Sequence, residues 1–459
     1  MAEQLGSAVF RARHGLRYAY VAGAMYRGVA STALVVRMGQ AGCIGYLGTG
    51  GMPLAWIESA LAEVARSLPE GQPWGANLLA NYSDPQMEDR TVDLLLRAGV
   101  QRVEAAAFMQ MTPALVRWRL AGLRREADGR VRCAHHVLAK VSRPEVAEAF
   151  MRPAPEGVVA KLLAQGMVTP LQAELARQVP MAHDICVEAD SGGHTDGGVA
   201  SVLMSAMLRL RERVCAEFAY AEPVCLGLAG GIGAPEAAAA AFVMGADFIL
   251  TGSINQCTAD AGMSEDVKDM LQQMNVQDTD YAPAGDMFET GARVQVLRRG
   301  VFFPVRANRL YALFTQYDSL DEIPEKLARQ VQDSYFKRSF AQVWAETQDY
   351  LREQGQEALI AKAESHPKQK MALVFRWYFG HSTAAAFAGR REDRVDYQVQ
   401  TGPALGAFNQ WVKGTPLEPW RARHADAIGI KLMTETAHYL GERFGALLAA
   451  GTPGGNKQQ

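Results

Sequence analysis

The chain has 459 residues, of which 49% are hydrophobic and 21% are charged. This is ordinary globular composition, and it excludes a mainly disordered chain and a small disulfide-linked scaffold. Lys and Arg total 47 and Asp and Glu total 49, which gives a net charge of -2. The overall charge therefore favours neither nucleic acid nor an anionic membrane as a partner.

The six cysteines are scattered and form no CxxC pair, a pattern typical of reduced thiols in the cytosol. The basic N-terminus is a poor signal peptide, and no apolar run reaches the roughly 18 residues that a membrane helix needs. HExxH and other metal-ligand spacings are absent from the sequence. We therefore expect a cytoplasmic enzyme without a metal, a nucleic-acid partner or a membrane partner.

Short apolar runs alternate with helical segments through the first part of the chain. Many of the predicted helices begin at a Ser, Thr or Asp followed by Pro, a favourable start for a helix. Alternating strands and helices predict a parallel sheet, and about eight such units in some 250 residues favour a (β/α)8 barrel over a doubly wound sheet. The predicted strands cover residues 43–47, 74–80, 100–108, 132–141, 184–189, 224–229 and 247–250.

The pattern changes after residue 258. Residues 259–400 are charged, aromatic and mostly helical in spacing, which predicts an inserted substrate-binding or lid subdomain. Residues 401–450 are expected to return to the barrel and to end in an amphipathic helix that packs on it. Residues 451–459 form a polar tail that we expect to be disordered. The barrel itself is predicted to span residues 1–258.

Two glycine-rich turns follow the last two predicted strands. Glycine lets the backbone approach a ligand, and the N-terminus of a helix offers unpaired N–H groups. Barrels often hold a phosphate after these strands. Each turn alone would be an ordinary strand–helix connection, but together they predict a phosphate site, which consists of Gly230, Gly231, Gly233, Thr251, Gly252 and Ser253.

A histidine follows the strand at residues 184–189 directly after two glycines, Gly192 and Gly193. Histidine is the side chain most easily tuned for proton transfer near neutral pH, so His194 is a candidate catalytic residue. Asp190 or Asp196 could orient it. The alternative is a loop histidine whose hydrogen bonds serve structure.

Small and polar residues mark the mouth of the predicted barrel. Ala24 and Met25 lie in a glycine-rich region where backbone amides could face a ring system, and Asn77 and Lys140 emerge from apolar strands. Lys140 could place a positive charge beside the pyrimidine side of a flavin, where it would stabilise a reduced anionic form. A solvated lysine at a strand end is the alternative. Cys257 is interpreted as a structural thiol rather than a nucleophile.

Several segments carry a family resemblance. Some of these segments resemble the superfamily of flavin-dependent nitronate monooxygenases and enoyl reductases. They are AGAMYRGVASTALVVRMGQAGCIGYLGTGG, EADSGGHTD, and AGGIG followed by GADFILTGSINQCT. Later segments resemble the PfaD-type trans-acting enoyl reductases of polyunsaturated fatty acid and polyketide synthases. These segments are NVQDTDYAPAGDMFETGARVQVLRRGVFFPVRANRLY, FRWYFG, VDYQVQTGPALGAFNQWVKGT and RHADAIGIKLM.

The resemblance implies an FMN-binding TIM barrel with an inserted helical substrate domain. It also implies a reaction, in which NADPH reduces FMN and the flavin N5 gives a hydride to the β-carbon of an enoyl thioester on an acyl carrier protein. Polyketide synthase modules would be partners, and a homodimer is one open arrangement. The glycine turns would hold the phosphate, and Ala24, Asn77 and Lys140 would contact the ring. His194 would donate a proton or orient the thioester.

Three other functions stay open at this stage. A nitronate monooxygenase would share the flavin site, a phosphosugar isomerase would bind phosphate without flavin, and a scaffold would have no activity. Carrier proteins are typically acidic, so an arginine cluster could serve as the docking patch. Two clusters are candidates, one formed by Arg117, Arg119, Arg124 and Arg125 and the other by Arg298 and Arg299. A solvated helix face is the alternative for each.

Overall fold

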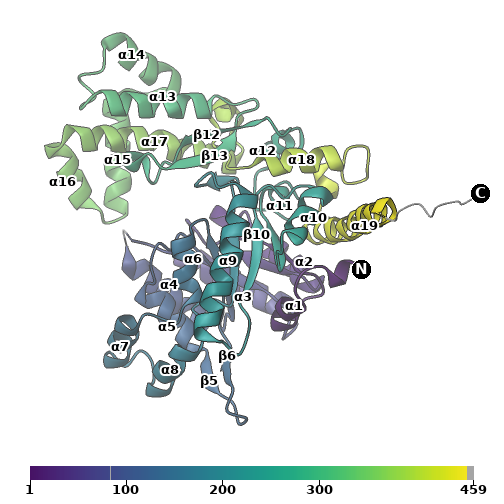
Figure 1. Cartoon of the computed structure of the whole chain (residues 1–459). Coiled ribbons are helices and arrows are strands. Elements are labelled where there is room, and N and C mark those ends of the chain that lie inside the picture. The colour runs from purple at the N-terminus through teal and green to yellow at the C-terminus, as the bar shows by residue number, and fades with distance from the viewer. Residues whose placement is uncertain (83, 452–459) are drawn as a thin grey trace, which may run out of the picture. The chain divides into compact units, whose positions relative to one another are not determined.

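The computed structural model describes residues 1–82 and 84–451 and contains two compact units. The barrel unit comprises residues 1–190, 197–262 and the chain from residue 410 onward. The second unit comprises residues 191–196 and 263–409 (Figure 1). The expected tail at residues 451–459 lies, apart from Gly451, outside the described residues.

Eight parallel strands close into a barrel, which confirms the predicted fold class. Each strand is buried along most of its length, as expected for strands covered by helices on the outside. In order around the barrel the strands are β1 (Tyr20–Ala22), β2 (Ile44–Leu47), β3 (Gly75–Leu79), β4 (Arg102–Ala106), β7 (His136–Val141), β8 (Asp184–Glu188), β10 (Cys225–Ala229) and β11 (Phe248–Thr251).

Some of the helices between these strands begin at a residue whose side chain caps them. Ser31, Asp84 and Thr112 each accept a hydrogen bond from a backbone N–H in the first turn of the following helix. Besides the first and last α-helices of the chain, the α-helices of the barrel unit are α2 (Thr32–Gln40), α3 (Leu54–Ser67), α4 (Pro85–Arg97), α5 (Pro113–Ala121), α6 (Pro144–Met151), α7 (Glu156–Ala164), α8 (Pro170–Leu175), α9 (Ala200–Phe218), α10 (Pro235–Val243) and α11 (Ser253–Gln256).

The C-terminal helix α19 (Ala425–Gly451) packs on the barrel against α10 and α2, as predicted. Gly429 makes the close approach possible, because a Cβ atom there would lie 2.4 Å from the ring of Tyr20. The packed face contains Ile428, Leu432 and Met433, all fully buried. Within the described part of the chain, no helix is both long enough and apolar enough to cross a membrane.

The predicted strand at residues 132–141 is wrong in its extent. The structure has a short strand β6 (Val131–Cys133), a break, and then the barrel strand β7. β6 pairs antiparallel with β5 (Leu123–Arg125) in a hairpin whose turn contains Gly129 at a φ of 84°. The two strands follow each other with little change in composition, so the apolar pattern gave no sign of the break.

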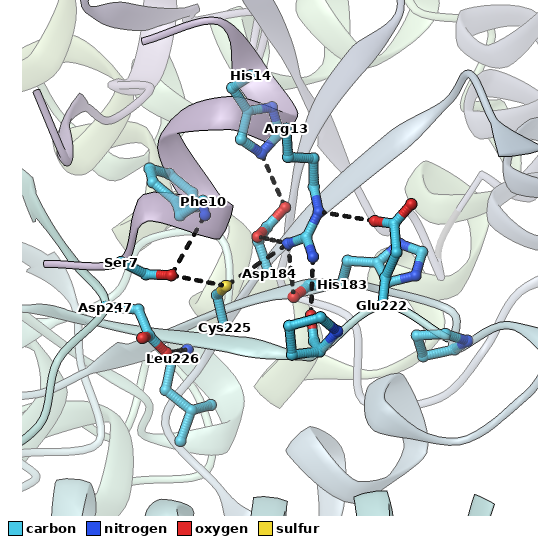
Figure 2. A network of polar contacts seen from close by, with 12 residues as sticks. Ser7, Phe10, Arg13, His14, His183, Asp184, Glu222, Cys225, Leu226 and Asp247 are labelled. Atoms are coloured by element: carbon cyan, nitrogen blue, oxygen red, sulfur yellow. Dashed lines mark hydrogen bonds and ion pairs between the residues drawn. The ribbon is translucent and has the colours of Figure 1, made fainter. Parts of the chain in front are cut away.

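The helix before β1 is held at the N-terminal ends of barrel strands by a network of polar contacts around Asp184 (Figure 2). Phe10 of α1 (Ala8–His14) stacks on Phe248 with ring centroids 4.2 Å apart. Arg13 Nη1 lies 2.5 Å from Asp184 Oδ1, and His14 Nε2 lies 2.9 Å from Asp184 Oδ2. Burial alone would raise the pKa of Asp184, but Arg13 and His14 outweigh it and hold that pKa well below the usual range.

The second unit has a small antiparallel sheet that the helical spacing did not predict. Its strands are β12 (Thr279–Pro283), β13 (Arg293–Leu297) and β9 (Gly193–His194), with β13 in the centre. The prediction placed residues 191–196 and the chain from residue 401 with the barrel. The structure groups residues 191–196 with the second unit, because His194 pairs with Val294 of β13. It places the later boundaries after residues 262 and 409.

Aromatic side chains form the core of the second unit. The ring of Phe288 contacts the rings of Phe314, Phe375 and Phe379 at centroid distances of 5.1 to 6.4 Å. Trp344 and Tyr378 are buried in the same cluster, so most of the aromatics serve the core of the insertion itself. The helices are α12 (Glu265–Gln272), α13 (Phe303–Gln316), α14 (Glu325–Gln330), α15 (Phe340–Glu353), α16 (Glu357–Ser365), α17 (Pro367–Ala388) and α18 (Pro403–Trp411).

Candidate functional site

Three charged side chains lie on neighbouring barrel strands. Successive side chains of a strand point to opposite faces, so every second one points to the barrel interior. Leu138 of β7 and Cys186 of β8 belong to the buried interior cluster. Lys140 and Glu188 follow two residues later on these strands, toward the C-terminal ends where barrel enzymes build their sites. Glu104 on the adjacent β4 completes the group.

The lysine of this group lies between two carboxylates. Lys140 Nζ is 3.0 Å from Glu188 Oε1 and 3.8 Å from Glu104 Oε1. The Glu104 side chain is 1% exposed, against 16% for Lys140 and 27% for Glu188. Glu104 Oε2 accepts a hydrogen bond from the backbone N–H of Ala24 at 2.9 Å, but Glu104 Oε1 is buried and accepts none within the described residues.

Burial and charge act on this group in opposite directions. Burial raises the pKa of Glu104 to about 7, although Lys140 and the Ala24 N–H partly oppose the rise. Burial would lower the pKa of Lys140, but the charges of Glu188 and Glu104 outweigh it and the pKa is raised. Lys140 therefore stays protonated, whereas Glu104 can gain or lose a proton near neutral pH.

Asn77 joins the same group through its backbone and side chain. Its Nδ2 donates to the carbonyl oxygen of Glu104 at 2.9 Å, and its own carbonyl accepts from Thr49 Oγ1 at 2.8 Å. The structure thus brings Ala24, Asn77 and Lys140 together around Glu104, a residue that the sequence pattern did not predict. The available signal was one charged residue inside the otherwise apolar run VEAAAF.

The loops at this end of β1 and β4 have strained backbones. Arg27 has a φ of 52° and Ala107 a φ of 63°, a region that residues other than glycine rarely adopt. Such strain is often kept at functional sites. Beside Arg27, the carbonyl of Met25 approaches Gly48 so closely that a Cβ atom there would lie 1.9 Å from the oxygen.

The predicted phosphate turns leave open space. Gly231 has a φ of 74°, and a Cβ atom built on it or on Gly252 would meet no heavy atom within 4 Å. Gly230 is needed for packing, because its Cβ would lie 2.7 Å from the carbonyl oxygen of Ala189. Gly233 is buried beside the start of α10, and Ser253 begins α11.

The hydroxyl of Thr251 is held inside the barrel unit. Its Oγ1 lies 2.6 Å from the hydroxyl of the buried Tyr20 and accepts a hydrogen bond from Asn255 Nδ2 at 3.0 Å. The predicted contribution of Thr251 to a phosphate site would therefore come from its backbone.

His194 belongs to the second unit and lies on strand β9 rather than in a loop. Its Nε2 is 3.0 Å from Oδ1 of Asp286, 92 positions later in the sequence. Burial would raise the pKa of Asp286, but the hydrogen bond and charge of His194 outweigh it and lower that pKa. Sequence spacing gave no signal for this pair. Of the aspartates considered first, Asp190 lies in the barrel unit and Asp196 in the second unit.

The two glycines before His194 are explained by close backbone packing. A Cβ atom on Gly192 would lie 2.5 Å from the backbone carbon of Thr401. Gly193 has a φ of 87°, and its Cβ would lie 2.9 Å from Gln400 Oε1. These contacts are within the second unit and fix the strand that presents His194.

Other residues that the sequence suggested as functional are buried and serve the structure. Cys257 is fully buried, and Arg423 Nη1 lies 3.5 Å from its sulfur. Arg119, offered as part of a docking patch, is also fully buried and donates to the carbonyl of Pro180. Among residues 1–82 and 84–451, no group of three or more His, Cys, Asp or Glu side chains is arranged to hold a metal ion.

Comparison with known proteins decides the family. The chain is 42% identical to the enoyl reductase domain of MlnA from the macrolactin biosynthesis cluster of Bacillus amyloliquefaciens, with a TM-score of 0.93. The match covers 97% of this chain and 99% of that domain. The chain belongs to the PfaD-type enoyl reductase family. A family model described as the inserted helical domain of [acyl-carrier-protein] S-malonyltransferase also matches residues 317–397.

Curated relatives of this enoyl reductase family member are longer proteins. The polyketide biosynthesis protein PksE of Bacillus subtilis is 54% identical over 96% of this chain and 57% of its own length. One of the polyunsaturated fatty acid synthase subunits of Thraustochytrium sp. is 45% identical over 90% of this chain and 28% of its own length. The chain therefore spans about half of the first relative and less than a third of the second.

Proposed function

We propose that this chain is an FMN-dependent enoyl reductase acting in trans in polyketide or polyunsaturated fatty acid biosynthesis. It would reduce the α,β-double bond of an enoyl thioester on an acyl carrier protein, with NADPH as the hydride source. The observation that carries the proposal is the 42% identity to the MlnA enoyl reductase domain over 97% of this chain. The names of the curated relatives support the biosynthetic setting.

The described residues fit a flavin that ends in a phosphate. Gly231 and Gly252 leave the open space that a phosphate cradle needs, and any side chain at these positions would fill it. At the other end of the proposed site, Glu104 Oε1 is a buried oxygen without a hydrogen bond, and Lys140 supplies a positive charge beside it. Both features suit a planar ring with polar edges.

The proposed roles follow from these contacts. Lys140 would hold the electron-rich edge of the flavin, and Ala24, Met25 and Asn77 would line the ring. When bound, FMN supplies hydride transfer from NADPH to the β-carbon of the enoyl thioester. The family resemblance assigns the other half of the reduction to His194. Held at Nε2 by Asp286, the imidazolium would donate its Nδ1 proton to the α-carbon or to the water that protonates it.

Anaerobic stopped-flow absorbance tests the proposal in two steps. The purified protein, loaded with FMN, is first mixed with NADPH and then with a crotonyl thioester on an acyl carrier protein. We expect bleaching of the flavin band and then a rapid return that depends on the thioester. Bleaching without return would contradict the enoyl acceptor. An absence of bleaching together with turnover of an alkyl nitronate in air would instead establish the monooxygenase reaction.

A further inference from the structure

An exposed face of the second unit combines arginines with apolar side chains. It lies on the turn after β13 and on the first turns of α13, and we call it the arginine face. Phe302 and Val305 are 57% and 66% exposed. Residues three, four and seven apart share one side of a helix, so Phe302, Val305, Arg306 and Arg309 lie together. The face consists of Arg298, Arg299, Phe302, Val305, Arg306 and Arg309.

The segment that carries this face has charge of one sign. Residues 291–317 contain five arginines and no aspartate or glutamate. Arg299 pairs with Asp278 at 3.3 Å, and Arg306 pairs with the buried Asp396. Arg298 and Arg309 are exposed and have no acidic partner within the described part of the chain. The guanidinium of Arg306 also lies 5.5 Å from the ring centroid of Phe302, so charge and apolar surface adjoin each other.

The other arginine cluster that the sequence suggested has no such excess of positive charge. It consists of Arg117, Arg119, Arg124 and Arg125. Arg117 pairs with Asp93 at 2.7 Å, Arg124 with Glu126 at 2.9 Å, and Arg125 with Glu174 at 2.8 Å. These three guanidinium groups already have carboxylate partners, and Arg119 of the same cluster is fully buried. Ion pairs of this kind leave little net positive charge at the surface to attract a partner. The charge distribution therefore distinguishes the two clusters and favours the arginine face.

Another copy of the chain is a poor occupant for this face. A two-fold symmetric dimer would bring this same patch of both copies together, and the residues of the patch include no acidic side chain to receive the arginines. An anionic partner instead gains charge-assisted contacts from Arg298 and Arg309, and its apolar side chains can cover Phe302 and Val305. Apolar contact at the centre of a charged patch is typical of specific protein docking.

We propose that the arginine face is the docking surface for an acidic carrier-protein domain that delivers the enoyl thioester. This inference rests on the proposed function, because it names the surface by which the carrier is recognised. Electrostatic attraction would guide the carrier to the face, and Phe302 and Val305 would supply short-range contact. Complementary charge acts mainly on the association rate and is weakened by salt.

The test compares two double variants of the full chain. Arg298→Glu with Arg309→Glu reverses the unpaired charges of the arginine face. Arg124→Glu with Arg132→Glu makes the same charge change on the exposed β5–β6 hairpin and is the matched control. Binding is measured by fluorescence anisotropy with a labelled crotonyl-carrier protein at low and at physiological salt. Turnover is measured with that substrate and with crotonyl-pantetheine, which lacks the carrier.

We expect the arginine-face variant to bind the carrier at least about tenfold more weakly, with a smaller dependence on salt. Turnover of crotonyl-pantetheine should match the unmodified protein, and the hairpin variant should behave normally in every assay. Equal carrier affinity in the two double variants would overturn the docking proposal. So would a change in oligomeric state confined to the arginine-face variant, because it would show a second copy on this surface.

A second variant separates folding from docking. Val305→Ser removes exposed apolar surface without reversing charge, and it should weaken carrier binding while thermal stability stays unchanged. If the unmodified protein does not reduce crotonyl-pantetheine, the proposed function is contradicted. The binding assay would still decide the docking proposal, because it needs no turnover.

Discussion

At the scale of single residues, the barrel unit and the second unit each hold groups that the sequence singled out and groups that it did not. Lys140 and Asn77 were predicted because polar residues at the ends of apolar strands are unusual. Glu104 has the same signal in a weaker form, because it lies inside the strand. Asp286 has no signal at all, since it reaches His194 only through the pairing of β9 with β13 and the return of the chain after β12.

The ionisation of Glu104 makes the free energy of unfolding depend on pH between about 4.5 and 7. Its pKa is raised from an ordinary 4.5 to about 7, so between these values the folded chain holds a proton that the unfolded chain has lost. The contribution of Glu104 to the free energy of unfolding is therefore greatest below pH 4.5 and decreases as the pH rises toward 7. The shift corresponds to on the order of 3 kcal/mol. Glu104→Gln should remove this dependence.

Urea unfolding of the barrel at pH 5, 6, 7 and 8, followed by fluorescence, measures the effect. We expect the unmodified chain to lose about 2.5 kcal/mol more than Glu104→Gln over this range. Glu126→Gln on the exposed hairpin is the control and should follow the unmodified chain. Parallel curves for the unmodified chain and Glu104→Gln would show that Glu104 is already ionised at pH 5.

Substitutions in the His194–Asp286 pair should slow the reduction of the thioester to different extents and leave the reduction of the flavin unchanged. His194→Gln removes the proton donor and should slow the thioester-dependent return of the flavin band by about 100-fold. Asp286→Asn keeps the ring but weakens its charge-assisted hydrogen bond, so a loss of about tenfold is expected. Reduction by NADPH should be unchanged in both variants, as stopped-flow absorbance would report.

Asp196→Asn is the matched comparison, because Asp196 was the other carboxylate near His194 in the second unit. A larger loss in Asp196→Asn than in Asp286→Asn would transfer the orienting role to Asp196. An unchanged rate in His194→Gln would remove His194 from the proton step.

At the scale of elements, the barrel strands were largely predictable. Strands buried on both faces are continuous apolar runs, and capping residues marked the starts of α4 and α5. The hairpin β5–β6 escaped because its strands have three residues each and are partly exposed, and β12 is likewise exposed in part. β9 has two residues and acquires its structure from a partner about 100 positions away, which no local pattern can reveal.

The turn after β10 gives a prediction about the cofactor. Gly231 has a φ of 74° and open space at its Cβ position, and it is exposed. Gly129 in the β5–β6 turn has a φ of 84°, is also exposed and also has open space. Alanine at either position should cost a similar backbone strain of about 1–2 kcal/mol. Only Gly231→Ala should also intrude on the proposed phosphate cradle.

Titration with FMN, followed by quenching of flavin fluorescence, compares the two alanine variants. The dissociation constant should rise at least about tenfold in Gly231→Ala, which corresponds to about 1.4 kcal/mol. It should be unchanged in Gly129→Ala. Equal affinities in the two variants would place the phosphate elsewhere than the turn after β10.

At the scale of the whole molecule, the two ends of the barrel have different roles. The C-terminal ends of the strands carry the mobile proton of Glu104 and the strained loops at Arg27 and Ala107. The N-terminal ends carry a buried network in which α1 is fixed to the start of β8 through Asp184 (Figure 2). Strain and perturbed protonation at one end can persist because the other end is firmly closed.

Asp184→Asn should therefore be among the most damaging single substitutions in the barrel unit. It leaves the buried Arg13 with the exposed Glu222 as its remaining carboxylate and removes the carboxylate partner of His14, a loss of about 3–5 kcal/mol in the free energy of unfolding. Urea unfolding measures it, and Asp128→Asn, in an exposed pair with Arg130, is the control that should not change the midpoint.

The pH dependence of this loss distinguishes it from the effect of Glu104. The pKa of Asp184 is held well below its usual range, so its contribution is present above the ordinary aspartate pKa of about 3.9 and is lost only as the pH falls further. The difference between the unmodified chain and Asp184→Asn should be constant from pH 5 to 8 and shrink below about pH 4. A difference that shrinks between pH 5 and 8 would mean that another group stabilises the end of the barrel that α1 covers.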